Sequence, residues 1–327
     1  MRLFVTGGAG FIGSNFVRMV IDGRLPGLED ANITVFDALT YSGTLTNLES
    51  VKDSSRLSFV KGDIRDAEAV GEALPGHDAI VHFAAESHVD RSVNESRIFV
   101  ETNVVGTQTL LDKAMALGIP RFVHISTDEV YGSIETGSWD EDEPLLPNSP
   151  YSASKAASDL LVRSYHVTHG LNTNITRCSN NYGPHHFPEK VIPLFVTNLL
   201  DGKKVPLYGD GLNIRDWLHV EDHCRGIALV LQSGKPGEVY NIGGGTELSN
   251  SELTSLLLKS TGRDDSFIER VAERKGHDRR YSVDIGKISL ELGYSPQVNF
   301  SDGLAAVVQW YRDNRWWWEP LKERAGL

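Results

Sequence analysis

The sequence predicts an α/β fold: a doubly wound parallel sheet with a smaller, interleaved C-terminal lobe. Three observations predict it. Short apolar runs alternate with helical patterns over the first 180 residues or so. A glycine-rich turn, GGAGFIG at 7–13, joins the first apolar run to the first helical pattern. The alternation then breaks at 179–193, a stretch rich in Asn, Gly, Pro and His.

The alternating elements can be placed in order. The predicted strands are 2–6, 32–37, 57–63, 78–87, 121–126 and 173–178. The predicted helices follow the glycine turn and then occupy 66–74, 96–117 and 150–169. Parallel strands connected in this way place ligands at the carboxyl edge of the sheet.

The second part of the chain is less regular. We expect 179–193 to be a structured loop that crosses to another lobe, 213–232 to be partly helical and 238–245 to be a strand. Ser249 and Glu252 form a capping box for a helix at 249–262, and a terminal helix at about 301–315 runs into Trp316–Trp318. We therefore expect one domain from 1–180 plus about 218–245, and a second from 181–217 plus about 246–327.

Composition and charge exclude several classes of protein. With 32 basic and 44 acidic residues the net charge is −12, which argues against nucleic-acid and anionic-membrane partners. Cys178 and Cys224 have no paired spacing, so neither a disulfide framework nor a zinc site is expected. No apolar run approaches the ~18 residues of a membrane span, and no signal peptide precedes the first strand. We expect a cytoplasmic protein.

The glycine turn predicts a dinucleotide site of the Rossmann kind. Gly7, Gly10 and Gly13 allow a tight turn and a close approach of the backbone to a pyrophosphate, although a glycine pattern alone also fits an ordinary turn. Asp37 ends the second strand, where a carboxylate accepts hydrogen bonds from a ribose diol and repels a 2′-phosphate. This favours NAD over NADP; the alternative is a plain strand-end aspartate.

Tyr151 and Lys155 are the candidate proton-transfer pair. Ser149 is a good N-cap and Pro150 suits the first helical position, so Tyr151 lies in the first turn and Lys155 on the same face. A cation about 4 Å from a phenol favours the phenolate by up to about 4 kcal/mol, and desolvation opposes this effect. The competing interpretation is a chance pairing of an aromatic residue with a lysine.

Two other clusters were considered as binding sites. His185 and His186 are adjacent, point in different directions and have no third ligand at a suitable spacing, so no metal is expected. Arg215, Arg274, His277, Arg279 and Arg280 would suit a diphosphate if they faced a cleft together, and are otherwise solvated surface.

Several motifs together resemble the extended short-chain dehydrogenase/reductases, and within them the dTDP-glucose 4,6-dehydratases. They are GGAGFIG, Asp37, FAAESHVDRS at 83–92, STDEVYG at 126–132, YSASK at 151–155, CSNNYGP at 178–184, FPEKVIP at 187–193 and KGHDRRY at 275–281. Thr127-Asp128-Glu129 is the narrowest of these signals, since epimerase relatives lack the adjacent acid pair. The chain has ERKGHD at 273–278 where the family commonly has DRPGHD.

The resemblance implies a reaction and roles for residues. Tyr151, helped by Lys155, takes the proton from the sugar C4 hydroxyl, while hydride passes from C4 to NAD. Glu129 removes the C5 proton, Asp128 protonates the departing C6 hydroxyl, Thr127 hydrogen-bonds the C4 oxygen, and the hydride returns to C6. Because neighbouring strand residues point to opposite faces, both acids reach one sugar only if strand geometry has ended by Asp128.

The resemblance also implies binding residues and partners. The cofactor residues would be Gly7, Gly10, Phe11, Ile12, Gly13, Asp37, Ala38, Leu39, Thr40, Asp63, Ile64, Phe83, Ala84, Ala85, Ser87, Thr102, Tyr151, Lys155 and Asn181. The residues for dTDP-glucose would be Ser87, Thr127, Asn180, Lys190, Val191, Pro206, Leu207, Tyr208, Arg215, Asn250, Arg274 and His277. A homodimer pairing the helices at 96–117 and 150–169 is expected. The alternatives are a nucleotide-sugar 4-epimerase, a dehydratase of another nucleotide sugar, and a non-catalytic NAD-binding protein.

Overall fold

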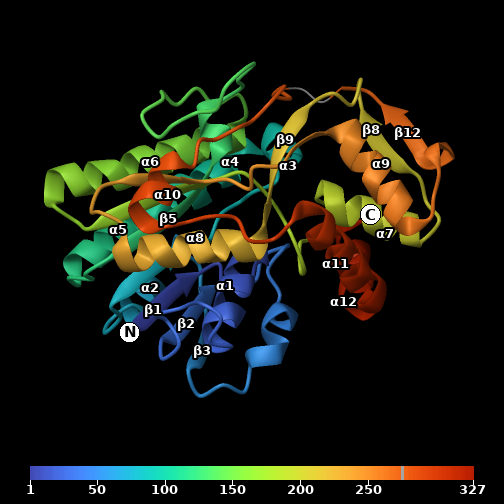
Figure 1. Ribbon diagram of the computed structural model, residues 1–327. Helices are drawn as coiled ribbons and strands as arrows, with labels where there is room; N and C mark the ends of the chain where they lie inside the picture. Colours follow the sequence, from blue (N-terminus) through green and yellow to red (C-terminus); the bar gives the residue numbers. More distant parts are fainter. Residues whose placement is uncertain (274–275) are drawn as a thin grey trace.

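A parallel sheet of seven strands forms the larger part of the molecule, seen in a computed structural model that describes residues 1–273 and 276–327 (Figure 1). The strand order is β10-β6-β5-β4-β1-β2-β3, and every neighbouring pair is parallel. The strands are β1 (Arg2–Thr6), β2 (Asn32–Asp37), β3 (Leu57–Lys61), β4 (Ala79–His82), β5 (Phe122–Thr127), β6 (Thr173–Cys178) and β10 (Val239–Ile242). The doubly wound prediction is confirmed.

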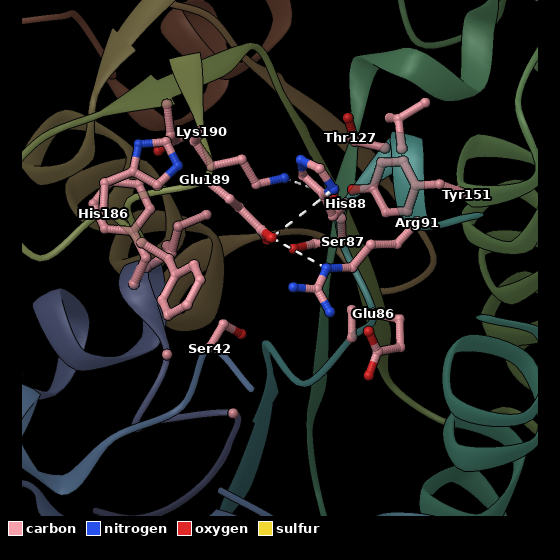
Figure 2. A pocket seen from close by; sticks show the side chains of 18 of the residues that line it. Ser42, Glu86, Ser87, His88, Arg91, Thr127, Tyr151, His186, Glu189 and Lys190 are labelled. Atoms are coloured by element: carbon pink, nitrogen blue, oxygen red, sulfur yellow. Dashed lines mark hydrogen bonds and ion pairs between the residues drawn. The ribbon is translucent and has the colours of Figure 1, made fainter. Parts of the chain in front are cut away.

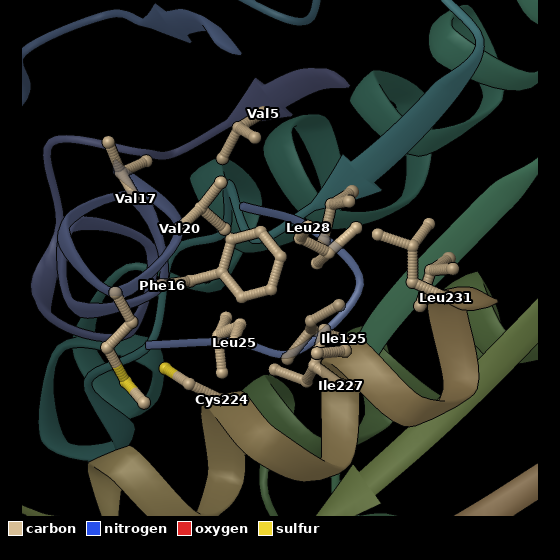
Figure 3. Close-up of a cluster of buried hydrophobic side chains, with 14 of the residues drawn as sticks. Val5, Phe16, Val17, Val20, Leu25, Leu28, Ile125, Cys224, Ile227 and Leu231 are labelled. Carbon is tan, nitrogen blue, oxygen red and sulfur yellow. The ribbon is translucent and has the colours of Figure 1, made fainter. Parts of the chain in front are cut away.

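Helices cover both faces of this sheet, which explains why its strands are apolar without alternation. One face carries α1 (Phe11–Ile21) and α8 (Val220–Ser233), whose side chains form the core cluster of Figure 3. The other carries α2 (Ala67–Ala73), α5 (Thr107–Ala116) and α6 (Pro150–His169). Within β1, Leu3 and Val5 belong to the first cluster and Phe4 to the second, as the pleat requires.

The helix that carries Tyr151 and Lys155 begins and ends where the sequence predicts. Ser149 caps α6 through the backbone N–H of Ser152, Pro150 is the first helical residue, and Gly170 closes the helix with φ 70°. The helix predicted at 96–117 is interrupted. It consists of α4 (Ser96–Phe99), a π-helical segment η2 (Val100–Gly106) and α5.

The remaining elements build the smaller lobe, around a second core rich in Leu, Val and Trp side chains. Its strands form two small sheets, β11-β9-β7 and β12-β8. They are β7 (Asn180–Tyr182), β8 (Val205–Tyr208), β9 (Ile214–His219), β11 (Glu247–Ser249) and β12 (Ile268–Val271). Its helices are α7 (Val191–Leu200), α9 (Asn250–Thr261), α11 (Phe300–Asp313) and α12 (Arg315–Ala325). α8 and β10 return to the large sheet, so the two parts interleave along the chain.

Several local predictions need correction. The stretch 179–193 contains β7 and the start of α7, and the segment after the helix predicted at 249–262, where the sequence predicts no element, contains β12. Trp316–Trp318 lie within α12 and do not trail after a terminal helix; Trp317 and Trp318 are buried in the smaller core. The sequence does not reveal β12, because this strand has no apolar run: its residues are half-buried or exposed, and it pairs with β8 alone.

Shorter elements connect these layers. They are η1 (Leu45–Val51), α3 (Val89–Asn94), η3 (Asp128–Tyr131), η4 (Asp265–Phe267) and α10 (Gly286–Leu292). The buried Asp222 of α8 accepts hydrogen bonds from the backbone N–H groups of Gln297 (2.9 Å) and Val298 (2.9 Å), just before α11. This carboxylate ties the large sheet's helix layer to the start of α11. Across 1–273 and 276–327, none of the helices is both long enough and apolar enough to span a membrane.

The turn after β1 leaves no room for a side chain at Gly7, and this gives a prediction. Gly7 and Gly118 both have positive φ, 69° and 64°, but a Cβ at Gly7 would lie 2.5 Å from the Ala84 nitrogen, whereas one at Gly118 meets no atom within 4 Å. Gly118→Ala should lower the free energy of unfolding by about 1 kcal/mol from backbone strain alone. Gly7→Ala should lower it by about 1–3 kcal/mol more, because the chain must move. Urea unfolding of both variants measures the difference; equal losses would contradict the close approach.

Candidate active site

A cavity of about 750 Å³ lies at the carboxyl edge of the large sheet, and residues of both lobes line it. Figure 2 shows part of its wall, with Thr127 and Tyr151 on one side and His186, Glu189 and Lys190 on another. Nearly all of the predicted cofactor and substrate residues line this one cavity. Leu39 lies outside the wall, and the prediction for Arg274 falls outside the described residues.

The glycine turn forms the part of the wall that a dinucleotide would need. A Cβ at Gly13 would lie 2.3 Å from the Gly7 carbonyl oxygen, so α1 packs directly on the turn. The N-cap of α1 is Gly10, which offers no side chain to the first-turn N–H groups. Gly7, Gly10, Phe11, Ile12 and Gly13 all line the cavity. An uncapped helix N-terminus facing a cavity fits the diphosphate of NAD.

Asp37 lies in the wall of the same cavity, at the end of β2. Its carboxylate is 8% exposed and accepts hydrogen bonds from the backbone N–H groups of Ala9 (2.9 Å) and Leu39 (2.8 Å). Burial raises the pKa of Asp37, and these two hydrogen bonds oppose the rise. Leu39, with φ 53°, therefore holds Asp37 in place.

Thr127, Asp128 and Glu129 stand where β5 ends. The strand stops at Thr127, whose side chain accepts a hydrogen bond from the Glu129 N–H (3.3 Å), and η3 begins at Asp128. Strand geometry has therefore ended at the required residue, and both acids line the cavity that holds Tyr151. The geometric condition derived from the sequence is met.

Asp128 is in an environment that favours its neutral form. It is 1% exposed, its Oδ2 atom has no hydrogen-bond partner, and the Thr127 hydroxyl donates to Oδ1 (3.3 Å). Burial, followed by the charges of Glu129 and Asp216, raises the pKa of Asp128 well above its ordinary value. A carboxyl group that stays protonated near neutral pH can act as a general acid.

Tyr151 and Lys155 line the cavity one helical turn apart. The Lys155 ammonium donates to the Ile125 carbonyl oxygen (2.8 Å) and lies 3.4 Å from His124 Nε2. Burial lowers the pKa of Lys155 to about 8, and the Asp159 charge opposes that fall. Burial, with the charges of Glu129 and Cys178, raises the pKa of Tyr151 well above its ordinary value, and a hydrogen bond with Thr127 opposes the rise. Desolvation thus outweighs the effect expected from the neighbouring cation.

The predicted nucleotide residues approach the cavity from the smaller lobe. Lys190 donates to the Ser87 carbonyl oxygen (2.7 Å), and Arg215 donates to the Asp278 carbonyl oxygen (2.9 Å) with its guanidinium over the Tyr281 ring. Arg279 and Arg280 do not line the cavity, because they pair with Asp210 and Glu247. The diphosphate interpretation therefore does not apply to these two arginines, which lie outside the cleft.

The cavity wall also contains charged residues that sequence reasoning missed. Glu189 accepts from Arg91 (3.1 Å) and lies 3.9 Å from His88 Nδ1, and Glu86 lines the same cavity (Figure 2). Their motifs, FAAESHVDRS and FPEKVIP, were noted for family resemblance, yet the spacing alone gives no reason to pair residues about 100 positions apart. His186 stacks on Phe11 and His185 packs against Trp310. Outside 274–275, no group of three or more His, Cys, Asp or Glu could hold a metal ion.

The lowered pKa of Lys155 predicts a pH dependence of stability. A lysine with a pKa of 10.5 unfolded and about 8 folded binds more protons in the unfolded state between these values, so its contribution to stability rises with pH from 8 to 10.5. The free energy of unfolding of the wild type, relative to Lys155→Met, should therefore increase by about 3 kcal/mol across this range. Urea unfolding without added nucleotide measures it; a difference that is flat with pH would contradict the burial of a charged Lys155.

Comparisons with known proteins agree with the geometry. The family model for GDP-mannose 4,6 dehydratase matches residues 4–307. A dTDP-glucose 4,6-dehydratase of Streptomyces antibioticus is 61% identical over 325 residues, covering 99% of this chain and 96% of the relative. The crystal structure of DesIV, a dTDP-glucose 4,6-dehydratase from Streptomyces venezuelae with NAD and TYD bound, superposes with TM-score 0.97 at 63% identity, over 98% of this chain and all of that one.

More distant relatives share the fold. A UDP-glucose 4-epimerase from Thermotoga maritima, solved with UDP-glucose, is 31% identical with TM-score 0.88 and covers 96% of this chain and 100% of its own. The identity is about twice as high for the dehydratases, and the match to them is nearly full-length on both sides. The chain therefore belongs to the nucleotide-sugar dehydratase family that the GDP-mannose 4,6 dehydratase model describes, and within it to the dTDP-glucose 4,6-dehydratases.

Proposed function

We propose that this chain is an NAD-dependent hydro-lyase that converts dTDP-glucose to dTDP-4-keto-6-deoxyglucose and water. The observation that carries the proposal is the placement of Asp128 and Glu129. Both acids line the cavity that holds Tyr151 and Lys155, immediately after strand geometry ends. A 4-epimerase needs no second pair of proton-transferring groups, whereas loss of water from C5 and C6 needs one acid and one base.

The cofactor would lie along the glycine turn. Gly7, Gly10 and Gly13 leave the backbone open to a diphosphate, Asp37 is placed for the ribose diol, and Phe83-Ala84-Ala85 would run along the cofactor. Bound NAD supplies a hydride acceptor and donor, taking hydride from C4 and giving it back to C6 within one turnover. We therefore expect it to stay bound between turnovers.

Tyr151 is the proposed base for oxidation at C4. Its phenol is buried, so its ionisation depends on groups that favour the phenolate. Lys155 is one helical turn away with a charged ammonium, and the Thr127 hydroxyl hydrogen-bonds the phenol. In this assignment Thr127 also binds the C4 oxygen of the sugar.

Asp128 and Glu129 divide the elimination between them. Asp128 is the more enclosed of the two and favours its neutral form, which suits a donor to the departing C6 hydroxyl. Glu129 is only half-buried and is the proposed base for the C5 proton. Two carboxyls in different surroundings supply the acid and the base that one elimination requires.

The nucleotide would extend into the smaller lobe. Asn180, Lys190, Arg215, Asn250 and His277 line the cavity there, and ammonium and guanidinium groups match diphosphate oxygens. Val191, Pro206, Leu207 and Tyr208 would enclose the rest of the nucleotide. The proposed domains are 1–180 plus about 218–245 and 181–217 plus about 246–327. They are supported by separate cores, two on the faces of the large sheet and one in the smaller lobe, although Ile288 and Tyr294 pack into a core of the large sheet.

The proposed assembly is a homodimer. Apolar side chains on η2 and α6 are exposed in the single chain, including Val100 at 50%, Leu160 at 57% and Val167 at 66%. Pairing these helices with a second copy would bury them. Since the nucleotide sugar and the nicotinamide cofactor are both cytoplasmic metabolites, we place the reaction in the cytoplasm.

The activity is tested by mass spectrometry of the protein with dTDP-glucose, in parallel with UDP-glucose and GDP-mannose. We expect loss of one water from dTDP-glucose. Glu129→Gln and Asp128→Asn should slow water loss by about 10²–10⁴-fold while NADH still forms from C4 oxidation, because each removes one proton-transfer group. Asp142→Asn, in an exposed loop, should match the wild type. Full-rate water loss by Glu129→Gln would refute the base assignment; C4 inversion without water loss would point to an epimerase.

The choice of NAD is tested at Asp37. Asp37→Ala removes a charged acceptor of the ribose diol, so NAD affinity should fall by about ten- to a hundredfold while discrimination against NADP narrows. Equilibrium dialysis with each nucleotide measures both effects, with Asp30→Ala, an exposed position, as the control. Unchanged discrimination would mean that another part of the site reads the ribose.

A further inference from the structure

An array of buried polar side chains lies behind the Tyr151–Lys155 pair. It connects β5, α6 and β6 through His124, Asp159 and Arg177. These three residues do not line the cavity, and none has a role in the reaction proposed above. All three are almost completely buried. Such an array requires a reason, since burying charge is unfavourable unless the charges act on one another.

His124 is in contact with the Lys155 ammonium. His124 Nε2 lies 3.4 Å from Lys155 Nζ, which also donates to the Ile125 carbonyl oxygen at 2.8 Å. Burial and the neighbouring ammonium lower the pKa of His124 to about 4, so its imidazole is neutral and can accept. Lys155 also lines the cavity, so its ammonium lies between these two contacts and the cavity.

Asp159 supplies the negative charge of the array. It follows Lys155 by one turn of α6, its Oδ1 lies 3.5 Å from His124 Nε2, and its Oδ2 accepts from Arg177 Nε at 2.9 Å. Although burial acts to raise the pKa of Asp159, the nearby imidazole of His124 and the charge of Arg177 hold it below its ordinary value. Asp159 is therefore an ionised carboxylate, and it opposes the loss of the Lys155 proton.

The array contains contacts that a simple structural ion pair would not need. Arg177 already satisfies Asp159 Oδ2 and also donates to the Tyr131 hydroxyl at 2.8 Å. Asp159 Oδ1 instead turns toward His124 and makes no hydrogen bond of good geometry, and His124 Nδ1 has no partner. The Nε2 atom of His124 thus lies in contact with both this oxygen and the Lys155 ammonium.

Seven ionisable groups on five elements surround Lys155 and the array behind it, besides the acids of the cavity wall. These groups are His82 on β4, His124 on β5, Asp159 and Tyr151 on α6, Arg177 and Cys178 on β6, and Tyr131 on η3. His82 is held by Thr6 (2.7 Å) and Thr107 (3.0 Å) and is kept neutral by burial. Asp159 is the one among them that is ionised with negative charge at neutral pH, since burial raises the pKa values of Tyr131, Tyr151 and Cys178.

We propose that Asp159 and His124 are positioning residues for this reaction, which keep the Lys155 ammonium protonated and aimed at the cavity from behind the sheet. The proposal rests on the function proposed above, because it requires that a charged Lys155 assists Tyr151. Asp159 acts by charge and His124 by holding the ammonium between that charge and the cavity. Neither touches the substrate or the cofactor.

The test compares Asp159→Asn with wild type, and Asp112→Asn as the control. Asp112 also lies against α6, where it accepts a hydrogen bond from Tyr165, but far from Lys155 in the helix. In Asp159→Asn, the alkaline limb of the pH profile of kcat/KM should move down by about one pH unit or more, because an opposite charge is lost near the lysine. An intact limb with uniformly lower activity at every pH would show a structural role and overturn the proposal.

A second readout is independent of activity. The wild-type stability step near pH 8, obtained by subtracting Lys155→Met, should move to lower pH when the same subtraction is made in the Asp159→Asn background. His124→Phe, which keeps a ring in the site, should move both readouts in the same direction if Asp159→Asn does not fold. Steps at the wild-type pH in both backgrounds would overturn the proposal. Failure of the proposed function is recognised separately, as a wild type that does not dehydrate dTDP-glucose while the stability readout behaves as expected.

Discussion

Desolvation at the end of β5 is the constraint on which the site depends. Asp128 and Lys155 are buried there and Tyr151 is half-buried, and desolvation moves the pKa of each toward its neutral form. For Asp128 this is useful, since a protonated acid can donate to a leaving hydroxyl. For Tyr151 and Lys155 it is a difficulty, since a base must lose its proton and an assisting cation must keep its own. The surrounding structure meets these two requirements, a base that loses its proton and a cation that keeps its proton, in different ways.

For Lys155, the sheet and α6 are the rigid elements that hold the neighbouring polar array in place. β5 and α6 are packed through apolar residues on either side of His124 and Asp159, so the polar array is held by the same contacts that form the core. Asn103 extends this support to the cavity loop. It hydrogen-bonds the backbone of Glu86 through both its amide atoms, and it donates to Ser154 at 2.8 Å, next to Lys155. The π-helical segment η2 carries Asn103. The π-helical distortion therefore occurs at Asn103, the residue that joins the cavity loop to the catalytic helix α6.

The elements predicted correctly from the sequence are those that depend on interactions between neighbouring residues. The glycine turn, Ser149 and Pro150 at the start of α6, and the run of parallel strands all follow from neighbouring residues, and the structure has them at the predicted positions. Contacts between distant segments could not be predicted in this way. The pairing of β12 with β8, the hydrogen bond from Ala9 to Asp37 and the ion pair of Arg91 with Glu189 depend on how the chain folds back. His124 and Asp159 were missed for a related reason: the buried face of α6 is itself largely polar, so Asp159 does not stand out on it, and His124 meets Asp159 only when α6 packs on β5.

Proton balance shows why the charge on Lys155 matters most. In the proposed reaction the C4 hydroxyl proton goes to Tyr151, the proton that Glu129 takes from C5 is returned there, and the proton that leaves as water comes from Asp128. Each turnover therefore ends with one proton too many on Tyr151 and one too few on Asp128. Burial favours the return of a proton to Asp128, because its pKa is raised well above the ordinary value. It opposes the departure of the proton from Tyr151. Of the two steps that restore the enzyme, only the ionisation of Tyr151 works against its surroundings, and a neighbouring ammonium that stays charged is what makes that step accessible.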